Sequence, residues 1–149
     1  MNSISTKQIA LLIPLTIFIH QLEEYFGQFP YWFSNLLNAQ LSNQDFIVIN
    51  GVGLLVLTLF SLSYFFNKKN VILVTLGTLV FVNGMTHIML SIFTYSYSPG
   101  TITSIVLFIP LGILVFKRLL PKLTPLEKII SIGVGIIILL IVGIIATNI

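Results

Sequence analysis

Residues 133–145 read GVGIIILLIVGII and carry no charged or amide side chain. They lie within a longer apolar stretch, residues 126–148. An α-helix needs roughly 20 residues to cross a bilayer, and this stretch is long enough. A helix that is apolar on every side has no face to turn towards water, so the stretch predicts a membrane-spanning helix.

Four further apolar stretches precede this one, at residues 8–26, 46–66, 71–94 and 101–119. Lipid offers no hydrogen-bond partner to an exposed backbone, so spanning segments of this length are expected to be α-helical. The sequence therefore predicts an all-α membrane protein, a bundle of five transmembrane helices. We expect residues 1–149 to form a single integral membrane domain.

The composition excludes several classes of protein. Hydrophobic residues make up 56% of the 149 residues and charged residues only 7%, and the mean hydropathy is +1.07. An ordinary soluble domain has roughly 25% charged residues, so a soluble globular enzyme and a disordered chain are both excluded. The chain has no cysteine, which excludes disulfides, cysteine-ligated zinc, iron–sulfur clusters and thiol catalysis.

The basic residues predict the orientation in the membrane. All seven fall on one side of a five-span chain, namely Lys7, Lys68, Lys69, Lys117, Arg118, Lys122 and Lys128. By the positive-inside rule that side is the cytoplasm, which places the N-terminus there. We expect the plasma membrane of a prokaryote, although the pattern leaves open the mirror topology in an organelle. The net charge of +3 then reflects topology, and no nucleic-acid partner is expected.

The segment between the first two spans predicts a short interfacial helix. Its apolar residues recur near helical spacing, at Trp32, Phe33, Leu36, Leu37 and Leu41. Pro30 suits the first turn of a helix, and Trp32 suits an anchor at the membrane surface. An irregular interfacial loop is the alternative.

Polar residues inside a span are costly and therefore mark candidate functional sites. They are His20, Glu23, Glu24, Asn50, Asn83 and His87. At 1.5 Å per residue, His20 lies about 18 Å and His87 about 24 Å from the basic ends of their spans, whereas Asn50 lies about 6 Å from the opposite end. All six are thus expected in the outer half of the bilayer. Residues three or four apart share a helix face, which joins His20 to both glutamates and Asn83 to His87.

These residues also carry a resemblance. The stretch HQLEE at 20–24 is a His-x-x-Glu-Glu motif near the end of the first span, and it is accompanied by NGMTH at 83–87 and YSPG at 97–100. Together they resemble the HXXEE-motif family of small integral membrane proteins. The resemblance covers nearly the whole chain, although the fifth span carries none of the motif residues. It implies a five-helix membrane fold but no particular reaction, because that family has no established activity.

The leading hypothesis is a metal-dependent enzyme. His20 and His87 would bind one divalent transition metal, either zinc or iron or manganese, together with Glu23 or Glu24. The other glutamate would act as a general base, and Asn50 and Asn83 would orient ligands or stabilise an oxyanion. A site at this depth suits a lipid-like or apolar small-molecule substrate, with hydrolysis as the preferred reaction.

Other functions stay open at the level of sequence. Two carboxylates near a histidine also suit a metal-free acid/base isomerase, whose groups would have pKa values pushed apart. Histidine and glutamate within spans equally suit a small-molecule binding protein or a proton-coupled carrier. Haem held by His20 and His87 is a further alternative. We expect Thr101, Thr103 and Ser104 to cap and pack the fourth span, and a homo-oligomer is not excluded by the sequence.

Overall fold

The computed structural model describes residues 4–148, and every regular element in that range is helical. The long helices are α1 (Thr6–Phe26), α3 (Asn43–Asn67), α4 (Asn70–Phe93) and α7 (Pro125–Thr147). The fourth span is made of α5 (Thr101–Thr103), the π-helical turn η1 (Ser104–Phe108), α6 (Ile109–Leu119) and the 3₁₀ turn η2 (Leu120–Lys122). A short helix, α2 (Phe29–Leu37), follows α1.

The helix ends follow local chemistry. Ser5 and Gln8 form a capping box at the start of α1, and Thr124 and Glu127 form one at the start of α7. Each box satisfies backbone N–H groups that have no partner within the helix. The π-turn lies directly before Pro110, where the Ile109 N–H donates to the Ser104 carbonyl. Proline lacks an N–H, so the regular α-helical ladder cannot continue through this point.

Five segments are long and apolar enough to cross a membrane, as predicted: the four long helices and the composite fourth span. The predicted helix between the first two spans is α2, with Pro30 in its first turn. Its nine residues are too few to cross a bilayer. The chain is therefore a multi-pass membrane protein with an all-helical fold.

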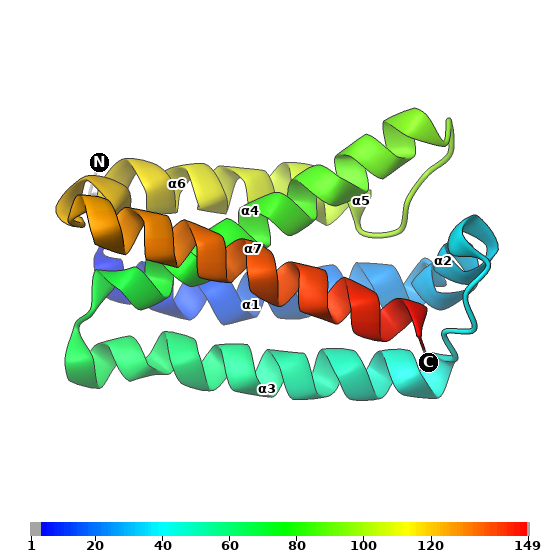
Figure 1. Cartoon of the computed structure of the whole chain (residues 1–149), viewed down its shortest axis with the longest axis horizontal. Coiled ribbons are helices and arrows are strands. Elements are labelled where there is room, and N and C mark those ends of the chain that lie inside the picture. The colour runs from blue at the N-terminus through cyan, green and yellow to red at the C-terminus, as the bar shows by residue number, and fades with distance from the viewer. Residues whose placement is uncertain (1–3, 149) are drawn as a thin grey trace.

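Helix α4 is the centre of the bundle, because it contacts α1, α3, α6 and α7 (Figure 1). Helix α2 and the loop between α4 and α5 lie together at one end, on the right in Figure 1. The α3–α4 and α6–α7 turns and the start of α1 lie at the other end, and they carry all seven lysines and arginines. The bundle thus has one basic end and one end without basic residues.

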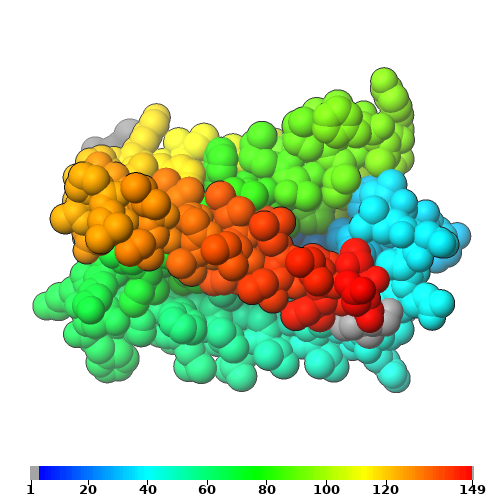
Figure 2. Space-filling view, in the orientation of Figure 1, coloured from blue at the N-terminus to red at the C-terminus, as the bar shows by residue number. Residues whose placement is uncertain are grey.

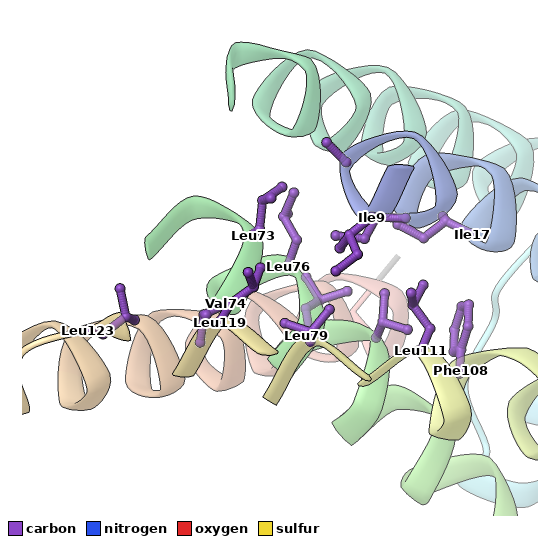
Figure 3. Packing of buried hydrophobic residues seen from close by; sticks show 14 residues of the cluster. Ile9, Ile17, Leu73, Val74, Leu76, Leu79, Phe108, Leu111, Leu119 and Leu123 are labelled. Atoms are coloured by element: carbon purple, nitrogen blue, oxygen red, sulfur yellow. The ribbon is translucent and has the colours of Figure 1, made fainter. Parts of the chain in front are cut away.

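The hydrophobic core lies between α1, α4 and the fourth span (Figure 3). Ile9, Ile13 and Ile17 come from α1, and α4 contributes residues between 73 and 80, among them Leu76 and Val80. Val115 is fully buried on the third side. Helices α3 and α7 bury little of their length, so their outward faces are apolar and exposed; α7 lies across the face shown in Figure 2. Those faces are suited to contact lipid.

Close packing of α4 against α6 depends on Gly77. A Cβ atom at this position would lie 2.5 Å from Cγ1 of Val115. We predict that Gly77→Val separates the two helices and lowers the free energy of unfolding by about 1–3 kcal/mol, measured as a lower Tm in detergent.

Gly53 of α3 is the matched control, because a Cβ there has no neighbour within 4 Å. Gly53→Val should leave the Tm nearly unchanged. An equal decrease in Tm in Gly77→Val and Gly53→Val would contradict the close packing of α4 against α6 at Gly77.

Candidate functional site

The HQLEE segment occupies the last turns of α1, where it meets α4 and the α4–α5 loop. His20 and Glu24 are four residues apart and share a face, with Nε2 of His20 3.5 Å from Oε1 of Glu24. The same Oε1 lies 3.2 Å from Nε2 of His87 on α4. One carboxylate oxygen thus lies between two imidazoles from different spans.

The three side chains form a buried cluster, which we call the His/Glu/His cluster (His20, Glu24 and His87). They are only 1%, 6% and 4% exposed. One ligand atom from each lies within 4.8 Å of the others, a spacing that suits a metal ion. Two histidines and one carboxylate form a ligand set used by catalytic zinc and non-haem iron.

Hydroxyl groups hold the outer nitrogen of each imidazole. Nδ1 of His20 lies 2.8 Å from Oγ1 of Thr103, and Nδ1 of His87 lies 3.2 Å from Oγ of Ser98. The Thr103 hydroxyl donates to the Gly100 carbonyl at 3.2 Å. The Thr103 hydroxyl thus contacts both the His20 ring and the backbone of the α4–α5 loop, which holds the ring in place.

Asn83 and two aromatic rings surround the cluster. The Asn83 side-chain nitrogen lies 3.4 Å from Nε2 of His20. The ring centroids of Phe108 and His20 lie 4.2 Å apart, and those of Phe29 and His87 lie 5.6 Å apart. These rings exclude water from two sides, which lowers the local dielectric and strengthens electrostatic interactions there.

Glu23 lies outside the cluster and anchors the α4–α5 loop. Its carboxylate accepts backbone N–H groups from Gly100 at 3.2 Å, Ile102 at 3.0 Å and Thr103 at 2.7 Å, and it also accepts the Tyr97 hydroxyl. The first N–H groups of a helix lack partners and carry partial positive charge. Glu23 therefore caps the start of the fourth span and fixes the position of Thr103.

The Tyr97 phenol is a donor in this arrangement. Burial and its hydrogen bond to Glu23 raise the pKa of Tyr97 to about 12. Tyr97 thus stays protonated near neutral pH and holds the Glu23 carboxylate from the loop side.

Gly100 brings the loop against both histidines. Its φ of 102° is a conformation that side chains disfavour, and a Cβ there would lie 2.7 Å from Cε1 of His20 and 2.9 Å from Cε1 of His87. The backbone approach that closes the cluster therefore requires glycine.

The structure separates Asn50 from the cluster. Gln21 donates to both the backbone and side-chain oxygens of Asn50 at 3.1 Å, and Asn50 donates to the Phe46 carbonyl at 3.1 Å. Asn50 thus ties α3 to α1. Of the predicted site residues, the structure brings together His20, Glu24, His87 and Asn83, whereas Glu23 and Asn50 have other partners.

Sequence reasoning missed the roles of several neighbours. Thr103 was expected to cap and pack, yet it also binds His20. Ser98 contacts His87, and its place in the polar loop at the level of the cluster was the available signal. The sequence did not indicate a role for Phe29 or Phe108, because nothing in it distinguishes a phenylalanine that packs beside a histidine from the other apolar residues of the chain.

The fold and the site define a multi-pass helical membrane protein with a buried His/Glu/His cluster near one end of the bundle. Residues 11–115 match a family described as proteins of unknown function with an HXXEE motif. Because the match covers more than half of the chain, the protein belongs to that HXXEE family. No curated protein and no solved structure matches the chain.

Glu23 and its loop contacts generate a stability prediction. Glu23→Gln replaces an acceptor oxygen with an NH₂ group that faces backbone donors. We expect this variant to lose about 1–3 kcal/mol of the free energy of unfolding, seen as a lower Tm in detergent. Tyr97→Phe removes only one hydrogen-bond donor to Glu23 and should lower the free energy of unfolding by less than Glu23→Gln does.

Glu127→Gln, which changes a helix cap at the basic end, is the control for charge removal. It should lower the Tm by less than Glu23→Gln does. A Glu23→Gln variant no less stable than Glu127→Gln would show that the carboxylate does not anchor the loop.

Proposed function

We propose that this protein is a membrane-embedded, metal-dependent enzyme whose metal ligands are His20, Glu24 and His87. The observation that carries the proposal is that one potential ligand atom from each of three buried side chains converges at one place. Nε2 of His20 and Nε2 of His87 both face Oε1 of Glu24, at 3.5 and 3.2 Å. A divalent cation among them would be held by all three atoms.

The surrounding charges support the same conclusion. All seven lysines and arginines are at the opposite end of the bundle, so no cationic side chain balances Glu24. Glu23 is offset by four hydrogen bonds, but Glu24 has only the two imidazoles as partners. A buried carboxylate without a compensating charge is costly, and a divalent ion would supply that charge.

The hydroxyl partners of the imidazoles fit metal ligation. A histidine that binds a metal usually donates its other ring N–H to an oxygen, which fixes the ring and its tautomer. Thr103 and Ser98 are suited to this task for His20 and His87. Two nitrogens and one oxygen, with a further position open, favour zinc, with iron or manganese as alternatives.

The proposed reaction is hydrolysis of a lipid-like substrate. A metal held by three protein ligands would act as a Lewis acid and activate water. Asn83, whose side-chain nitrogen lies 3.4 Å from Nε2 of His20, would donate a hydrogen bond to the substrate. The predicted general-base role for Glu23 is not retained in this proposal, because its carboxylate oxygens already accept four hydrogen bonds.

A metal-free acid/base enzyme is the second candidate. The two Nε2–Oε1 distances also suit a proton shared between Glu24 and an imidazole. One imidazolium would then neutralise Glu24, and the cluster would move protons within a dry site. Metal content separates the two candidates.

The location follows from the distribution of charge. We propose that the basic end faces the cytoplasm and that the membrane is the plasma membrane of a prokaryote. The cluster would then lie on the outer side of the bilayer, at the depth where the linkages of lipids to their headgroups are found.

Metal analysis tests the proposal. The detergent-purified protein, prepared without chelator and offered zinc, iron and manganese, should retain about one metal ion per chain. His87→Ala and Glu24→Gln should lose it. Thr103→Val should weaken metal affinity about 10- to 100-fold, because a partner of a ligand histidine is removed.

Asp45→Asn is the matched control, since Asp45 is a carboxylate at the same end of the bundle that caps α3 and lies outside the cluster. It should retain the metal. A folded wild-type protein that binds none of the three metals would refute the proposal and leave the acid/base enzyme as the favoured function.

A further inference from the structure

A second candidate binding site lies on the surface near the cluster. It is a cleft of about 560 Å³ between α2 and the α4–α5 loop. Both of these elements lie at the end on the right in Figure 1. Tyr31 and Trp32 line it from α2, and Ser96 and Tyr97 line it from the loop. The Trp32 indole N–H lies 3.5 Å from Oγ of Ser96, so the two walls are in contact.

The cleft is separated from the His/Glu/His cluster by very little chain. Pro99 lines the cleft, and the next residue, Gly100, packs against both histidines. Tyr97 lines the cleft and also donates to Glu23, the neighbour of Glu24. Only the α4–α5 loop would therefore separate a molecule bound in the cleft from the proposed metal.

The lining has the chemistry of a site for an organic cation. Four aromatic residues contribute to it, namely Phe26, Tyr31, Trp32 and Tyr97, and Tyr31 is 70% exposed. Among the described residues that line the cleft, none is a lysine or an arginine. Aromatic faces attract ammonium groups, and tryptophan does so best.

The distribution of charge between the two ends of the bundle also favours a cation in the cleft. Three of the four carboxylates, Glu23, Glu24 and Asp45, lie at this end, and all seven basic residues lie at the other. Even with a divalent ion bound to the cluster, these three carboxylates leave a net charge of −1 at this end, which favours a cation over a free phosphate or sulfate in the cleft. The exposed apolar side chains of the membrane-spanning helices would contact the hydrocarbon part of an amphiphile whose cationic group lies in the cleft.

We propose that this cleft binds the substituted or quaternary ammonium group of an amphiphile. The inference rests on the proposed function, because it names the headgroup class of the substrate on which the metal site would act. The ammonium group lies against the rings of Trp32 and Tyr31, and the remainder of the molecule extends past Pro99 towards the cluster.

Trp32 is the single tryptophan of the chain, so its fluorescence reports binding directly. Choline is titrated into the protein in an uncharged detergent, and the same titration uses 3,3-dimethylbutan-1-ol, a neutral molecule of nearly the same shape. We expect saturable changes with choline and at least about fivefold weaker binding of the neutral molecule. Equal binding of the two would overturn the proposal, and so would no saturable response to choline.

Substitutions at Tyr31 test the aromatic wall. Tyr31→Leu should weaken choline binding about three- to tenfold, whereas Tyr31→Phe should preserve it because the ring remains. Tyr95→Leu is the control, since Tyr95 is 98% exposed and does not line the cleft. An unchanged affinity in Tyr31→Leu would contradict the proposed binding mode.

The His87→Ala variant separates this proposal from the metal proposal. Choline binding should persist in it, because His87 does not line the cleft. Retained choline binding in a wild-type protein without metal would refute the metal enzyme alone. Stoichiometric metal without choline binding would refute the cleft proposal alone.

Discussion

The Glu24 carboxylate, buried between two imidazoles and without a cationic side chain nearby, is the constraint on which the site depends. Its Oε1 atom lies 3.2 and 3.5 Å from the two Nε2 atoms, and its side chain is almost fully buried. Burial of a negative charge in an apolar bundle is stable only when a positive charge or strong hydrogen bonds compensate it. The compensation of this one buried charge is therefore what the proposed metal site would supply.

The rest of the structure positions the partners of that carboxylate. The core between α1, α4 and the fourth span sets His20 and His87 at the same level, because it locks the two helices that carry them. Glu23 then caps the fourth span, which places Thr103 against His20 and Gly100 against both rings. The two adjacent glutamates of the motif thus have different tasks. Glu23 holds the α4–α5 loop, and Glu24 lies in the His/Glu/His cluster.

The five spans and α2 were predictable, because the length of an apolar run and the place of a proline determine them locally. The convergence of His20 and His87 at one depth followed from the helical rise alone. The different environments of Glu23 and Glu24 did not follow, because both share a helix face with His20 and only the path of residues 97–103 separates them. Asn50 lies at the expected level, but its side chain turns to Gln21. The rotation of α3 about its axis decides this, and a nearly uniform apolar helix encodes that rotation weakly.

X-ray absorption spectroscopy of the metal-loaded protein tests the central claim most directly, because it reports the atoms bound to the ion. For zinc, the account predicts two imidazole nitrogens at about 2.0–2.1 Å, together with oxygen ligands at about 2.0–2.2 Å. Glu24→Gln should abolish this signature, and Asp45→Asn should preserve it. A shell of oxygen atoms only, or an unchanged spectrum in Glu24→Gln, would contradict a metal centre formed by His20, Glu24 and His87.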